Sequence, residues 1–80
     1  MQSPPQTPPN NILLDGWAIA VDWKKLYYTS SFFVPSVNWR YDKKVLQASA
    51  DAAGCEVGIK GVVEEGVRGL RVWCLKPCSI

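Results

Sequence analysis

The 80-residue sequence contains no histidine, the side chain that most often acts as a general base at neutral pH. Ser-His and Cys-His arrangements, which activate a nucleophile, are therefore excluded. Neither a glycine-rich nucleotide-binding motif, nor a P-loop, nor a nucleophile elbow occurs. No apolar run approaches the ~18 residues that a membrane-spanning helix needs. These absences predict a protein that is not an enzyme, holds no cofactor and does not enter a membrane.

Cysteine is scarce, with three residues at Cys55, Cys74 and Cys78. Their odd number disfavours a disulfide framework, and the first residues lack the basic start and apolar stretch of a signal peptide. We therefore predict three free thiols and a reducing, cytoplasmic location. A closed zinc site needs four ligands, usually in more closely spaced pairs, so we predict no metal site.

Charge is nearly balanced, because nine basic and seven acidic residues give a net charge of +2. This balance permits contact with nucleic acid or an acidic protein but favours neither. The only adjacent carboxylates are Glu64 and Glu65, which we expect in a solvated turn. A catalytic carboxyl pair needs a cleft that raises the pKa of one member, and a solvated turn provides none.

Apolar residues, by contrast, make up 48% of the chain, the proportion of an ordinary globular domain. Four tryptophans, three tyrosines and two phenylalanines are too many large side chains for the core of one domain of this size. At least one aromatic side chain is therefore expected on the surface, where such residues favour binding.

The chain divides into a tail and one domain. Residues 1–11 contain four prolines and no large apolar side chain after Met1, which predicts a disordered segment. Residues 12–76 are predicted to form a single domain, and residues 77–80 a short C-terminal tail.

The first part of the domain alternates between apolar and smaller or polar residues. The apolar members would share one face of a strand: Trp17, Ile19, Val21 and Trp23. A helix over residues 17–28 is the alternative. In the strand interpretation, Lys24 and Lys25 form a turn. A second strand then runs over residues 26–34, and Pro35 ends it.

A helix follows, with either Ser36 or Asp42 as its N-cap. Its apolar stripe would consist of Tyr41, Val45, Ala48 and Ala52. Gly54 is expected to end it, because glycine adopts the left-handed conformation of a helix C-terminus without strain.

Residues 55–63 and residues 70–75 each show the two-residue alternation of side chains that is typical of a strand. The segment 64–69 between them contains two glycines. This pattern predicts a β-hairpin. The full order is strand, strand, helix, strand, strand. It predicts an α+β fold in which one helix packs on a small antiparallel sheet.

Two surfaces are candidate binding sites. At the start of the helix an aromatic side chain stands beside three cations: Trp39, Arg40, Lys43 and Lys44. An aromatic ring that stacks on a base, with cations that hold phosphate, would bind nucleic acid. An ordinary solvated helix face is the alternative.

The second surface lies on the last strand, where Arg71, Trp73 and Leu75 share one face. If Leu70, Val72 and Cys74 point to the helix, this face is open and would form a homodimer contact or a partner site. If the alternation runs the other way, Trp73 anchors the core.

Part of the chain resembles short, mostly uncharacterised proteins encoded by phages and prophages. The resemblance covers residues 33–75 and rests on Val34-Pro35, Ala53-Gly54, the segment 62–66 and the segment 69–73. It implies an accessory protein of a mobile element and carries over no site residues. We therefore predict that the protein acts by binding a host or phage protein, with nucleic-acid binding as the alternative.

Overall fold

The structure, a computed structural model, describes residues 11–28 and 30–78. The disordered tail predicted from the sequence lies almost entirely outside these residues. Asn11, which the sequence assigned to that tail, is the first residue of a strand. No helix in the described part of the chain is long and apolar enough to cross a membrane.

The described chain contains five strands, one α-helix and one short 3-10 helix. In order they are β1 (Asn11–Leu14), β2 (Trp17–Ala20), η1 (Lys25–Tyr28), β3 (Phe32–Pro35), α1 (Trp39–Ala52), β4 (Glu56–Glu64) and β5 (Val67–Lys76). The α+β class and the predicted order of two strands, a helix and two strands are confirmed, and β1 precedes them. The strands are divided between two antiparallel sheets, β1-β2 and β3-β5-β4, a division that the sequence did not predict.

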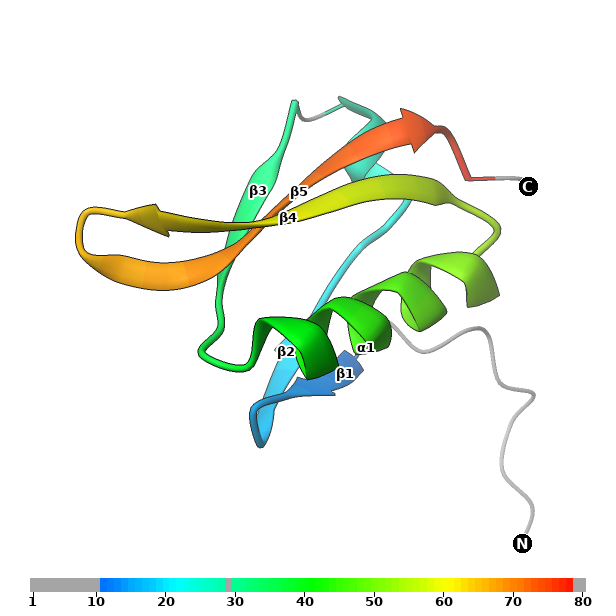
Figure 1. The fold of residues 1–80 in the computed structure, drawn as a ribbon. Coiled ribbons are helices and arrows are strands. Elements are labelled where there is room, and N and C mark those ends of the chain that lie inside the picture. The colour runs from blue at the N-terminus through cyan, green and yellow to red at the C-terminus, as the bar shows by residue number, and fades with distance from the viewer. Residues whose placement is uncertain (1–10, 29, 79–80) are drawn as a thin grey trace, which may run out of the picture.

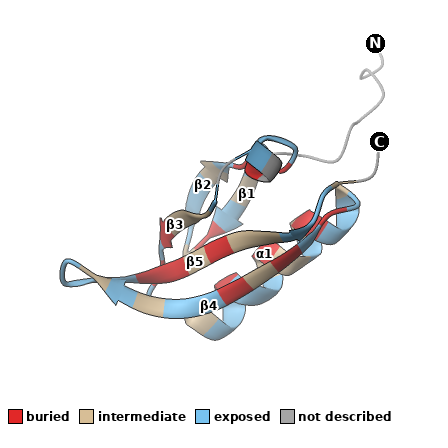
Figure 2. Cartoon of the chain, turned by 90° about the horizontal axis from the view of Figure 1, so that it is seen from above, coloured by how far each residue is buried: buried red, intermediate tan, exposed pale blue. Residues whose placement is uncertain are grey.

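Helix α1 packs against both sheets and so joins them (Figure 1). The core lies where the three meet, and its most deeply buried apolar side chains are Leu14, Leu46, Ala50, Leu70 and Val72. In β4 and β5, Val57, Ile59, Leu70 and Val72 are buried, and the residues between them, Gly58 and Arg71, are only partly buried (Figure 2). The sheet β3-β5-β4 therefore turns one face to α1 and leaves the other face open.

The N-terminal hairpin has a signal that the sequence analysis overlooked. β1 and β2 are joined by Asp15 and Gly16, which both have positive φ, at 49° and 82°. Such a turn matches the twist of paired strands, and Asp-Gly is one of its preferred sequences. The strand predicted from Trp17 is confirmed as far as Ala20.

Beyond Ala20 the prediction of a second strand over residues 26–34 is wrong for its first half. The Asp22 side chain and carbonyl both accept a hydrogen bond from the Lys25 backbone N–H, at 3.3 and 3.1 Å. This closed turn starts η1, which buries Leu26. An aspartate that binds the backbone three residues on favours a turn over a strand. Among the described residues of this segment, the strand covers Phe32–Pro35 alone.

The helix begins between its two predicted N-caps and faces the core differently than predicted. Asn38 is its N-cap, because the Asn38 side chain accepts a hydrogen bond from the Tyr41 N–H at 3.2 Å, so neither Ser36 nor Asp42 has that role. Of the predicted stripe only Val45 packs against the core, as a partly buried residue, and the buried positions are Asp42, Leu46 and Ala50. Tyr41, Ala48 and Ala52 are exposed instead. Gly54, with φ of 80°, follows the last helical residues as predicted.

The C-terminal hairpin is confirmed, and it is longer than predicted. Its turn consists of Glu65 and Gly66 only, both with positive φ. Glu64 therefore belongs to β4 and Val67 to β5.

A disulfide bond joins Cys55 and Cys78, while Cys74 is free. The prediction of three free thiols is wrong because pairing of β4 with β5 brings the two ends of the hairpin together. Two of the three cysteines can form a disulfide while the third stays a free thiol, so the odd number did not exclude a bond. This correction also removes the cysteine argument for a reducing, cytoplasmic location, since disulfides persist mainly in oxidising compartments.

The disulfide predicts a large effect on stability. It closes a loop with a sequence separation of 23 residues. Loop-closure entropy for such a loop is about 3 kcal/mol, so the Cys55→Ser, Cys78→Ser double variant should melt about 10–20 °C lower than the native chain. Thermal melts followed by circular dichroism without reductant measure this, with Cys74→Ser as the matched control. Equal melting temperatures for the double variant and the native chain would contradict the bond.

Candidate functional site

An apolar trough separates the two sheets on the side where β2 and β3 approach each other. Two adjoining hollows form it, with volumes of about 460 and 900 Å³, and both are lined by Ile19 and Pro35. Within the described residues, β2 pairs only with β1 and β3 only with β5. Both β2 and β3 thus present to the trough a strand edge that has no strand partner among these residues.

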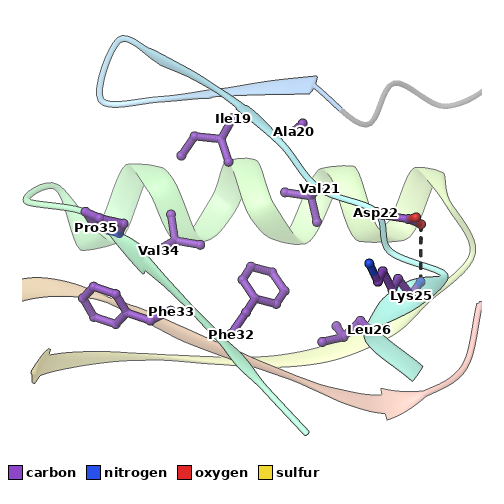
Figure 3. A pocket seen from close by; sticks show the side chains of 10 residues that line it. All are labelled: Ile19, Ala20, Val21, Asp22, Lys25, Leu26, Phe32, Phe33, Val34 and Pro35. Atoms are coloured by element: carbon purple, nitrogen blue, oxygen red, sulfur yellow. Dashed lines mark hydrogen bonds between the residues drawn. The ribbon is translucent and has the colours of Figure 1, made fainter. Parts of the chain in front are cut away.

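The first hollow has an apolar floor. Ile19 and Val21 lie on one side and Phe32 and Val34 on the other, with α1 behind them (Figure 3). Val21, Val34 and Leu26 are almost fully buried. Asp22 and Lys25, which are joined by the hydrogen bond that starts η1, stand at its end (Figure 3).

The second hollow is wider and carries exposed apolar side chains. Trp17 is 73% exposed, Val37 70% and Val67 45%, and all three line it. They come from β2, from the connection between β3 and α1, and from β5. Asp15 and Arg68 supply one charge of each sign. An exposed apolar cluster rimmed by polar groups is typical of a protein interaction site.

A pair of carboxyl groups, Asp15 and Asp42, lies beside this second hollow, which Asp15 helps to line. Asp42 is fully buried and accepts hydrogen bonds from the Ser36 hydroxyl at 2.6 Å and the Asp15 N–H at 3.1 Å. The Asp15 carboxylate accepts a bond from the Val37 N–H at 2.9 Å. Sequence reasoning found carboxylates together only at Glu64 and Glu65, because a contact across 27 residues leaves no local signal.

The two carboxyl groups have opposite pKa shifts. Burial raises the pKa of Asp42, and the neighbouring Asp15 carboxyl raises it further, although the Ser36 hydrogen bond acts the other way. The hydrogen bond from Asp42 lowers the pKa of Asp15, as does the bond from the Val37 N–H. Asp42 therefore keeps its proton to a higher pH than an ordinary aspartate, and Asp15 loses its proton at a lower pH. The hydrogen bonds of the pair hold the β1–β2 turn against the start of α1.

The basic and aromatic cluster predicted at the start of the helix is only partly assembled. Arg40, Lys43 and Lys44 are exposed on α1. Trp39 is half-buried, with ring carbons over Gly61, and the Arg68 guanidinium carbon lies 4.2 Å from the centroid of the Trp39 ring. The ring thus already has a cation against it, and a base would have to displace Arg68 in order to stack there.

The last strand presents Arg71, Trp73 and Leu75 on the open face, since Leu70 and Val72 are fully buried on the other. The Arg71 guanidinium binds the Glu64 carboxylate through Nε at 3.0 Å and through a second, shorter contact from Nη2. Arg71 also donates to the Ser31 hydroxyl. Leu75 is 59% exposed.

Trp73 is half-buried on this open face because its ring lies over Gly58 of β4. A Cβ built on Gly58 would come within 2.3 Å of the Trp73 ring. The same arrangement covers Gly69 with Phe33. The aromatic side chains of this face thus fill space left by glycines.

Comparisons with known proteins give no relative. No family model matches the chain, nor does any curated protein or solved structure. The resemblance to phage and prophage proteins therefore stays a prediction.

The fit of Trp73 over Gly58 predicts that the effect of Gly58→Ala on stability differs between the native chain and the Trp73→Ala variant. Gly58→Ala should destabilise the native chain by about 1–3 kcal/mol, because the new methyl group displaces the ring. In the Trp73→Ala background the same substitution should be neutral or stabilise by about 0.5–1 kcal/mol, since alanine restricts the unfolded chain more than glycine. Urea unfolding of the four proteins measures both effects. An equal effect of Gly58→Ala in both backgrounds would contradict the contact.

The buried carboxyl group predicts a pH-dependent gain from Asp42→Asn. A raised folded-state pKa means that Asp42 supports the fold when protonated and that this support is lost as pH rises through the raised pKa. Asparagine imitates the protonated acid at every pH. The variant should therefore gain stability relative to the native chain as pH increases from 4 (about the ordinary carboxyl value) toward neutrality.

Urea unfolding at several pH values tests this expectation. The matched control is Asp51→Asn, an exposed carboxyl on the same helix whose Oδ1 accepts a bond from Gln47. A stability difference between Asp42→Asn and the native chain that does not change with pH would be evidence against the buried carboxyl pair.

Proposed function

We propose that the protein is a non-enzymatic binding module that holds an extended segment of a protein partner in the trough. The observation that carries this proposal is the gathering of Trp17, Val37 and Val67, all substantially exposed, around one hollow. These residues come from three separate segments, so the fold and not the sequence brings them together. A few side chains at the centre of a contact provide most of its affinity, and tryptophan is enriched among them.

The walls of the trough favour an extended partner. β2 and β3 each leave one edge unpaired among the described residues, so their outward backbone N–H and C=O groups are free to bind an added strand. Successive side chains of an extended segment point in opposite directions. Every second side chain would then contact the apolar floor formed by Val21, Leu26 and Val34.

Nucleic-acid binding, the alternative, has less support. The three exposed cations Arg40, Lys43 and Lys44 are suited to phosphate contact. The aromatic partner that they need, Trp39, already packs on Gly61 and Arg68. Origin in a phage or another mobile element, with a host or phage protein as the partner, is part of the same proposal.

A peptide selection tests the proposed function. Random peptides displayed on phage and selected on the immobilised full chain should enrich sequences with apolar residues at every second position. Trp17→Ala should weaken the binding of an enriched peptide by about tenfold, the effect of losing ~1.4 kcal/mol. Ala20→Arg, which places a long charged side chain at an exposed position of the first hollow, should weaken it at least as much.

Leu75→Ala is the matched control, since Leu75 is an exposed apolar residue on the open face of β5, outside the trough. Its binding affinity should equal that of the native chain. Enriched peptides that lose affinity with Leu75→Ala and keep it with Trp17→Ala and Ala20→Arg would refute the trough as the site.

A further inference from the structure

The longest unpaired strand edge of the described residues belongs to β4. Four strands have a free edge: β1, β2, β3 and β4. The first three are four residues long, and β3 ends in a proline, which cannot donate a ladder hydrogen bond. β4 has nine residues and no proline. A long edge strand is a template for pairing with another chain.

One part of this edge is accessible. The turn end of the β4–β5 hairpin extends beyond the start of α1 (Figures 1 and 2). Val63 is 58% exposed there, and Lys60 and Gly61 are exposed as well. In the order β3-β5-β4 this outer edge lies on the far side of β5 from β3, and none of residues 60–64 lines either hollow of the trough.

The charges along β4 favour pairing with β4 of a second copy, and they favour one register of that pairing. Glu56, Lys60 and Glu64 recur every four residues. Two copies could pair antiparallel through β4 with Lys60 of one copy opposite Lys60 of the other. This register would also place Glu56 of each copy opposite Glu64 of the other. Like charges directly opposite each other destabilise a strand pair, whereas opposite charges stabilise it. A register shifted to place Val62 opposite Val62 brings Lys60 of each copy opposite Glu64 of the other.

A shift in the other direction, with Gly58 opposite itself, would pair Glu56 with Lys60. The ladder is irregular at that end, because the register with β5 shifts between Glu56 and Val57. Trp73 also lies over Gly58. The register centred on Val62 is therefore the one that the charges and the regular part of β4 both favour.

We propose that two copies of this chain pair antiparallel through residues 60–64 of β4, with Val62 on the two-fold axis. Three strands from each copy then form one continuous sheet. Lys60 joins the ion pair that Glu64 and Arg71 already form in the other copy. Val63 is placed opposite Gly61 and is covered. This is a self-complementary contact, as a two-fold interface requires.

The dimer is weak and independent of the proposed function. A ladder of five residues buries far less than the ~1,600 Å² of a standard stable interface, so the contact forms at high protein concentration. The trough stays open in both copies because none of the contact residues 60–64 lines it. Failure of the dimer would thus leave peptide binding unaffected, and failure of peptide binding would leave the dimer unaffected.

Cysteine cross-linking in the full chain tests the register. Each single substitution is made in the Cys74→Ser background, which removes the free native thiol. Val62→Cys places two thiols opposite each other at a Cα separation of about 4.5–5.5 Å, within disulfide range. Val63→Cys and Lys60→Cys are the controls, because residues displaced along the ladder by two or more are about 7–8 Å apart or farther.

Val62→Cys should form covalent dimers on mild oxidation about tenfold faster than either control, as measured on non-reducing gels. Adding Lys60→Glu to Val62→Cys should reduce that rate about tenfold, because like charges then face each other. Fastest cross-linking through Lys60→Cys, or equal rates for all three cysteines, would overturn the proposal. An unchanged rate after Lys60→Glu would overturn the role of charge in it.

Discussion

The buried carboxyl group of Asp42 joins three segments that are far apart in the sequence. It accepts hydrogen bonds from the Asp15 N–H and the Ser36 hydroxyl, and Asp15 in turn binds the Val37 N–H. A buried carboxyl group is costly unless hydrogen bonds satisfy it. The β1–β2 turn, the end of β3 and the start of α1 must therefore stay together, and the position of the N-terminal hairpin depends on this cluster.

The trough follows from that constraint. Asp42 holds the turn of the N-terminal hairpin at α1. Beyond β2, Trp23 holds the chain to the same helix, because its Nε1 donates to the Ser49 hydroxyl at 2.8 Å. β3 is instead held to β5 by its own ladder and by the bond from the Ser36 N–H to the Arg68 carbonyl. Two sheets anchored on different partners leave an apolar gap between β2 and β3, with an unpaired edge on each side.

Local sequence signals predicted the helix and the C-terminal strands. Contacts between distant residues determine the helix face, the disulfide bond and the trough. Gly54 at the helix end and the alternation in β4 and β5 were readable because each depends on neighbouring residues. The helix face was not, because a carboxyl group occupies a core position that only Asp15 and Ser36 make acceptable. The bond between Cys55 and Cys78 depends on hairpin pairing, and the trough depends on three segments that meet only in the fold. Asp15-Gly16, by contrast, was a local turn signal that could have predicted β1.

The central claim is that the facing edges of β2 and β3 are open in the free protein and become paired when a peptide binds. Amide hydrogen exchange, measured on the full chain with and without a bound peptide, tests this claim most directly. The account predicts fast exchange at the outward amides of residues 19–22 and 32–34 in the free protein. It also predicts marked slowing there on binding, with little change in β4. Unchanged exchange in these two segments, or slowing confined to other parts of the chain, would contradict the account.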